Sequence, residues 1–168
     1  MIVTGAGPLI TLAVARALDA LLLPRLPVII PDMVRLAILQ SLDQPSAREV
    51  AQWIRRHDGH GVRVACTEVY EEFEVLRGVN AAMKTGSRCE QAAVEVFWTE
   101  LERRDAGAIL LFDDNRVTKQ NFLGRLPDPV ILTSTSEFLY GLERPHPSVS
   151  AEHMLTRAAD IRGKEILR

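Results

Sequence analysis

The sequence contains few of the features that mark specialised classes of protein. Its two cysteines, Cys66 and Cys89, are too few for a disulfide framework and lack the spacing of metal ligands. We therefore expect two buried, reduced thiols and a cytoplasmic location. The four histidines share no ligand spacing either, so no zinc site is predicted.

The chain also lacks an excess of positive charge and an unbroken apolar run of membrane length. A net charge of -2 gives no overall attraction to phosphate backbones, so contact with nucleic acid would depend on local basic clusters. Charged residues and prolines interrupt the apolar stretch from Leu9 to Ile30, namely Arg16, Asp19, Pro24, Arg25 and Pro27. We expect neither a signal peptide nor a membrane span.

Signatures of nucleotide binding are missing as well. There is no Walker A glycine loop, and no third glycine follows Gly5 and Gly7 at the spacing of a dinucleotide fingerprint. The chain has no internal repeat and no low-complexity segment.

What the chain does contain is a regular alternation of short apolar runs with longer helical periods. This alternation predicts an α/β fold, a three-layer α/β/α sandwich with a mainly parallel sheet of about five strands. The expected strands are 2–3, 28–30, 62–66, 108–112 and 130–132. The expected helices are 9–21, one starting at Asp32, one starting at Ser46, 67–77, 87–104, 115–124 and 134–142.

Local signals predict where several of these elements begin and end. Ser46-Ala47-Arg48-Glu49 is typical of a capping box that opens a helix. The sequence changes character at Arg144, where Pro145-His146-Pro147 predicts a stiff linker. We therefore divide the chain into a domain over 1–143 and, over 144–168, a linker with a charged helical tail that Ser150 caps.

Acidic residues follow the clearest predicted strand. Asp113 and Asp114 come directly after the apolar run 108–112, and ligands of open parallel sheets bind at the carboxyl ends of strands. At least one of these carboxylates is expected to enter a cleft there, where oxygen ligands suit Mg²⁺. The alternative is that Asp114 or Asn115 caps the next helix.

Glu90 is a second candidate, in the first turn of the helix predicted over 87–104. It would face the same cleft if that helix starts near the strand ends. The alternative is a capping box, Ser87-Arg88-Cys89-Glu90, in which the Glu90 carboxylate accepts from the backbone N–H of Ser87.

In their order along the chain, these motifs resemble PIN-domain proteins of the bacterial toxin type. Gly5-Ala6-Gly7-Pro8-Leu9-Ile10 is similar to their opening Asp-Ala-Ser-Pro-Leu-Ile motif except at its first position. Val34-Arg35-Leu36-Ala37 matches a Val-x-x-Glu signature with alanine in place of glutamate. Cys89-Glu90-Gln91-Ala92-Ala93 resembles a Gly-Glu-x-x-Ala helix start. Leu110-Leu111-Phe112-Asp113-Asp114-Asn115-Arg116 resembles the strand-Asp-Asp-Arg element, and Val130 to Leu139 resembles the closing strand with its Thr and Leu.

The resemblance implies a site and a reaction. Glu90 with Asp113 or Asp114 would hold Mg²⁺ or Mn²⁺, which in this family positions water for attack on an RNA phosphodiester. Thr133 or Thr135 would place a hydroxyl near the site. Gly5 and Ala37 replace two of the acidic ligands, so metal affinity and water activation are expected to fall sharply.

Basic residues near the predicted cleft complete the candidate set. Arg116 and Lys119 follow Asp114 closely enough to meet a phosphate at the rim, although most such side chains are ordinary solvated charges.

These motifs favour a metal-dependent ribonuclease of the toxin-antitoxin type that is catalytically impaired. The missing acids are compatible with a natural degenerate member or with a disarmed variant. The alternative functions are a non-catalytic module that binds RNA or protein, and a simple dimerising module. The resemblance implies an RNA substrate, a small antitoxin partner and a homodimer.

Overall fold

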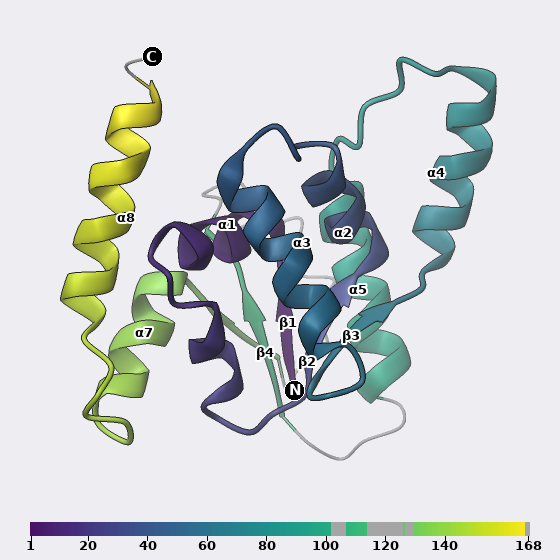
Figure 1. Cartoon of the computed structure of the whole chain (residues 1–168). Helices are drawn as coiled ribbons and strands as arrows, with labels where there is room; N and C mark the ends of the chain where they lie inside the picture. The colour runs from purple at the N-terminus through teal and green to yellow at the C-terminus, as the bar shows by residue number, and fades with distance from the viewer. Residues whose placement is uncertain (102–106, 114–125, 127–129, 167–168) are drawn as a thin grey trace.

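The computed structural model describes residues 1–101, 107–113, 126 and 130–166, and it contains one parallel sheet (Figure 1). The strand order is β3-β2-β1-β4-β5, so the first strand lies at the centre. The strands are β1 (Ile2–Thr4), β2 (Val28–Pro31), β3 (Val62–Ala65), β4 (Ala108–Leu111) and β5 (Val130–Thr133). Every neighbouring pair is parallel, which is the arrangement that the alternating sequence pattern predicts.

Helices cover both faces of this sheet, because successive residues of its strands point to opposite sides and are apolar on both. Ile2 and Ile30 point into a core shared with helices α1 (Ala6–Val14) and α3 (Pro45–His57). Val3 and Ile29 point to the other face, where α5 (Arg88–Leu101) packs. The predicted three-layer α/β/α sandwich is confirmed.

The helix expected over 9–21 is shorter than the sequence pattern predicts. α1 ends at Val14, and a separate 3₁₀ helix, η1 (Leu18–Leu22), follows it. Between them Arg16 takes a φ of 55°. The backbone N–H groups of Ala17 and Arg16 donate to Leu12 O at 2.8 Å and Ala13 O at 2.9 Å, which is the Schellman pattern that ends a helix. The prediction missed this end because the position carries arginine instead of glycine.

The predicted capping box at Ser46 is also wrong. α3 begins with Pro45 in its first turn, after Gln44, and no side chain caps it. Proline suits a first helical turn, since it has no N–H to satisfy there. The hydroxyl of Ser46 is buried and has no hydrogen-bond partner among the described residues.

Asp32 links the starts of two helices, α2 (Asp32–Leu39), which follows β2, and α4 (Glu68–Val79), which follows β3. Its Oδ1 accepts from the backbone N–H of Met33 at 2.8 Å and from the hydroxyl of Thr67 at 2.7 Å. Its Oδ2 accepts from the backbone N–H of Thr67 at 2.7 Å. This buried carboxylate therefore fixes the start of α4 against the start of α2.

Beyond its first turn, α4 extends away from the sheet, on the right in Figure 1. The Glu95 carboxylate on α5 accepts from the backbone N–H groups of Glu68 and Val69, which holds the first turn of α4 in place. Farther along, Phe73 is fully buried against Met33, whereas Val79 at the other end is 87% exposed.

The last two helices, α7 (Thr135–Glu143) and α8 (Ala151–Ile166), form an antiparallel pair on the α1 side of the sheet (Figure 1). Glu143 accepts from the backbone N–H of Ala151 at 2.7 Å, and the backbone N–H of His153 donates to Ser150 Oγ at 3.4 Å. Ala151 and Ala158 are buried in the same core as α1, so the predicted tail helix packs on the domain. Across the described ranges, no helix combines the length and the apolar character needed to cross a membrane.

We expect Asp32→Ala to lower the free energy of unfolding by about 3 kcal/mol, because three buried donors would lose a charged acceptor. Urea denaturation followed by circular dichroism measures this change. Asp43→Ala is the matched control, since Asp43 is exposed and makes no hydrogen bond in the described part of the chain. Equal stabilities of the two variants would contradict the proposed role of Asp32.

Candidate functional site

The sheet has one place where its connections change direction, and it lies between β1 and β4. From β1 the chain passes to β2 and β3 on one side, and β4 and β5 then continue on the other side. Thr4 pairs with Leu111 at the carboxyl ends of β1 and β4, and the backbone N–H of Gly5 donates to Leu111 O at 3.1 Å. Ligands of open parallel sheets bind beyond such a junction. Gly5 and Asp113, both named from the sequence, follow these two strand ends.

Asp113 is held by hydrogen bonds from two helices. Thr135, in the first turn of α7, donates from its backbone N–H to Oδ1 at 2.9 Å and from its hydroxyl to Oδ2 at 2.8 Å. Thr11 of α1 donates its hydroxyl to the same Oδ2 at 3.0 Å. The start of α7 adds the positive end of its helix dipole. The carboxylate thus has a fixed orientation although Asp113 is exposed.

Of the two threonines predicted near the site, only Thr135 contacts Asp113. The hydroxyl of Thr133 points to Glu137 Oε2 at 3.4 Å. Glu137 forms a capping box with Ser134 at the start of α7. The backbone N–H of Ser134 donates to this carboxylate and, with the Ser134 hydroxyl, lowers the pKa of Glu137. Thr133 therefore belongs to the helix cap.

Phe112 covers the position of the missing first acid. A Cβ added to Gly5 would lie 2.8 Å from Cε2 and 3.0 Å from Cδ2 of the Phe112 ring, closer than atoms in contact allow. Gly5 itself is buried and has an extended φ of -81°, which any residue can adopt. The backbone conformation thus admits any residue at this position, but a side chain there requires the Phe112 ring to move.

Glu90 and Ala37 lie on α5 and α2, two helices that pack against each other. Glu90 is half-buried in the first turn of α5, and its Oε2 is buried without a hydrogen-bond partner among the described residues. Both residues lie within the described part, and no hydrogen bond joins Glu90 to Ser87, so the alternative interpretation as a capping box is wrong. Ala37 is half-buried on α2 and offers no ligand atom on its side chain.

The remaining predicted site residues, Asp114, Arg116 and Lys119, lie outside the described residues. Within the described ranges, no group of three or more His, Cys, Asp or Glu side chains could hold a metal ion. Two of the acids that the resemblance assigns to the site are described. Oε2 of Glu90 has no hydrogen-bond partner among the described residues, and both oxygens of Asp113 already accept hydrogen bonds. These residues do not fit a Mg²⁺ site, which needs several free oxygen ligands.

Sequence reasoning missed two residues that shape this edge of the sheet. Asp32 follows β2 at the same edge, and a carboxylate directly after a strand is the same sequence signal that Asp113 gives. Both oxygens of Asp32 already accept hydrogen bonds, from Met33 and Thr67. Thr11 lies inside an apolar helix pattern that gave no sign of this role. Its one hydroxyl proton is shared between Asp113 Oδ2 and Gly7 O, each 3.0 Å away.

The cysteines differ from the prediction of two buried thiols. Cys66 is exposed directly after β3, and a single residue separates it from the start of α4. Cys89 is half-buried, and its thiol lies 3.5 Å from Met33 O. Burial, with the neighbouring Glu90 carboxylate, raises the pKa of Cys89 from 9.0 to about 11.

Comparison with protein-family models, with curated proteins and with solved structures finds no match to this chain.

We expect Gly5→Ala to destabilise the fold by about 1–3 kcal/mol, because the added methyl group overlaps the Phe112 ring. Gly7→Ala is the matched control: its Cβ would lie 3.5 Å from Asp113 Cβ, an ordinary contact. That variant is expected to be neutral or more stable by up to about 1 kcal/mol, since alanine favours the helix. Thermal and urea unfolding of both variants measure the difference.

Phe112→Leu tests the cause of this effect. In the double variant Gly5→Ala/Phe112→Leu, the cost of the new methyl group should shrink by about 0.5 kcal/mol or more relative to the sum of the single variants. Strict additivity would show that the ring is not what excludes a side chain at position 5.

We expect Cys66 to react with iodoacetamide at pH 8 while Cys89 stays unmodified until urea unfolds the chain. The thiolate is the reactive form, and the raised pKa of Cys89 keeps its thiol protonated in the folded state. The stability that this raised pKa contributes is fully present below pH 9.0 and is lost as pH rises toward about 11. Mass spectrometry of peptides reports both sites, and equal labelling rates at pH 8 would refute the assignment.

Proposed function

We propose that this chain is a PIN-like domain of the toxin-antitoxin ribonuclease type in which RNA cleavage is catalytically impaired. The observation that carries the proposal is the pairing of Gly5 with Phe112. At the carboxyl end of the central strand, where the resemblance requires an acid, there is neither a carboxylate nor space for one until the Phe112 ring turns.

The arrangement of the sheet supports the PIN-like assignment. β1, β2 and β4 are neighbours and parallel, so the segments that carry Gly5, Asp32 and Asp113 start from the same edge. The motif positions on α2 and α5 belong to helices that flank these strands. We expect a crevice for an RNA phosphate at this edge of the sheet.

The hydrogen bonds of Asp113 support the impairment. Hydrogen bonds from Thr11 and Thr135 already compensate part of the negative charge of this carboxylate. A cation would have to compete with these donors. Two carboxylates fewer at positions 5 and 37 reduce the anionic charge further. We therefore assign no step of cleavage to a bound Mg²⁺ or Mn²⁺.

Three further parts of the proposal rest on the resemblance: an RNA substrate, a small antitoxin protein that binds at the crevice, and a homodimer. The predicted phosphate contacts Arg116 and Lys119 rest instead on their position just after Asp114. A cytoplasmic location is the one that suits a protein with an RNA substrate and unpaired thiols.

A second candidate function is a non-catalytic module that binds RNA or protein at the same crevice. The structural use of Asp113 favours it, because a side chain that fastens α1 and α7 to β4 keeps a role without any metal. In that case the only role of Asp113 would be to hold α1 and α7 in position around the crevice.

The proposal is tested by restoring the acids. We expect the chain as it stands to cleave a structured RNA slowly in Mn²⁺, and the variant Gly5→Asp/Ala37→Glu to cleave at least about tenfold faster. Adding Phe112→Ala should raise the rate further, since it frees the space that the new aspartate needs. Initial rates of cleavage of a labelled RNA measure all three proteins.

Asp113→Asn in the restored background is the control against contaminating nucleases, and it should abolish the gained activity. If restoration yields no cleavage while the unaltered chain still binds the RNA by fluorescence anisotropy, the binding module is the correct interpretation. If the unaltered chain cleaves rapidly and Asp113→Asn stops it, the claim of impairment is wrong.

A further inference from the structure

The outer half of α4 leaves apolar side chains uncovered. Val75, Leu76 and Val79 are 71%, 42% and 87% exposed, respectively. No other helix has more than one exposed large apolar residue among the residues described. Together with Glu72, these three follow the spacing i, i+3, i+4 and i+7, so the four side chains lie along one face of the helix. A group of this kind, unlike scattered single residues, marks a contact surface.

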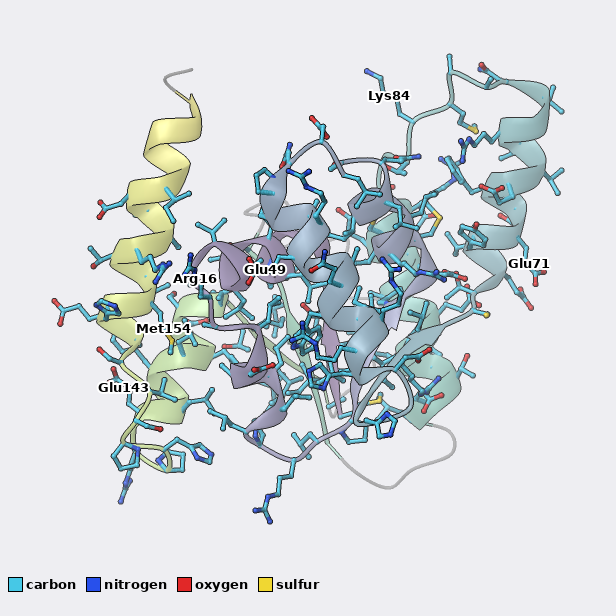
Figure 2. The ribbon with its side chains drawn as sticks, viewed as in Figure 1. Arg16, Glu49, Glu71, Lys84, Glu143 and Met154 are labelled. Atoms are coloured by element: carbon cyan, nitrogen blue, oxygen red, sulfur yellow. The ribbon has the colours of Figure 1, made fainter. Side chains whose placement is uncertain are left out.

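The first turns of the same helix are acidic. Four glutamates are exposed there, namely Glu68, Glu71, Glu72 and Glu74. Figure 2 shows the Glu71 side chain on the side of α4 that is turned away from the sheet. Arg77 is the only basic residue of α4, and its Nη1 lies 3.4 Å from Glu74 Oε1. Within the described ranges no salt bridge engages Glu68, Glu71 or Glu72, so their charges are available to a partner.

These two properties make the outer half of α4 a weak helix when nothing covers it. Glu68 and Glu72 repel each other one turn apart, and Gly78 disfavours the helical state. The domain holds α4 near its start, through Glu95 and the buried ring of Phe73. The three exposed apolar residues belong to none of the hydrophobic clusters that the described residues form. A partner that supplies cations and apolar side chains would neutralise the charge and cover the apolar face.

We propose that α4 is the docking surface for an amphipathic helix of a partner protein, whose apolar residues are flanked by Lys and Arg. The partner's apolar residues cover Val75, Leu76 and Val79, as anchors at helical spacing do in helix recognition. Its cations pair with Glu71 and Glu72. The surface extends along the 12 residues of α4, about 18 Å, so a partner helix of about three turns covers it.

The α4 helix of a second copy is not the partner that these charges select. In a parallel pair of α4 helices, acids would face acids, and in an antiparallel pair they would face the apolar residues of the outer half. Neither arrangement gives a free cation to Glu71 or Glu72, since Arg77 already pairs with Glu74. The surface includes none of the candidate residues of the crevice, and the proposal does not depend on RNA cleavage.

The probe is a fluorescent peptide of about 15 residues, with leucines at helical spacing and lysines elsewhere. We expect saturable binding by fluorescence anisotropy, with shifts of the backbone amide resonances of Val75, Leu76 and Val79. Two comparison peptides should bind at least about tenfold more weakly: one with the same residues in shuffled order, and one with glutamates in place of the lysines. No binding of the lysine peptide, or equal binding of the glutamate peptide, would overturn the proposal.

Val75→Ser/Val79→Ser separates binding from folding. Serine and valine have similar helix propensities and both positions are exposed, so the urea midpoint should change little. Binding of the lysine peptide should weaken at least about tenfold. Tyr140→Ser is the matched control, because Tyr140 is 53% exposed on α7, away from α4 (Figure 1). It should bind the peptide as the unaltered chain does.

Glu71→Gln/Glu72→Gln tests the ionic contacts. We expect weaker binding of the lysine peptide at low salt and a smaller loss of affinity as salt is raised. Unaltered affinity in Val75→Ser/Val79→Ser would show that α4 is not the docking surface. Sedimentation velocity tests the other occupant: if the unaltered chain forms dimers that Val75→Ser/Val79→Ser abolishes, α4 contacts a second copy and the proposal is wrong. RNA cleavage is a separate measurement, so the two proposals fail independently.

Discussion

The carboxylate of Asp113 is the point on which the functional edge of this protein depends. It follows β4, and it accepts hydrogen bonds from Thr11 on α1 and from Thr135 on α7. One carboxylate at the end of β4 is therefore bonded both to α1, the helix that follows β1, and to α7, the helix that follows β5. Because a charged acceptor is costly to leave without donors, these three segments keep their relative positions.

Asp32 repeats this arrangement on the other side of β1, where it joins the starts of α2 and α4. Among the described residues, the carboxyl edge thus holds two acids whose oxygens are already committed to the protein, and one, Glu90, whose Oε2 is buried without a partner. An active cation site requires the opposite distribution, with several oxygens free and close together. The proposed loss of cleavage follows from this distribution as much as from the replacements at positions 5 and 37.

Much of the fold was predictable because apolar patterning reports burial directly. All five strands were expected within a residue or two, since Val28 to Ile30 and Ala108 to Leu111 are apolar on both faces. The start of α7 at Ser134 was predicted correctly as well. The end of α1 was not, because Arg16 occupies a backbone conformation that the sequence signals only when glycine is present. The cap of α3 failed because Pro45, a neighbour of the expected cap, begins the helix.

For the site, the sequence by itself determined which residue types stand at the strand ends: Gly5 after β1, Asp32 after β2 and Asp113 after β4. Chain order and the carboxyl-edge rule for parallel sheets suffice for that. Only the tertiary structure decided what each of them does, because hydrogen-bond partners come from residues distant in the chain. Thr135 reaches Asp113 across 22 positions and Thr11 across 102. The Phe112 ring likewise fills the space at Gly5 from the residue that follows β4, and no local pattern records such an approach.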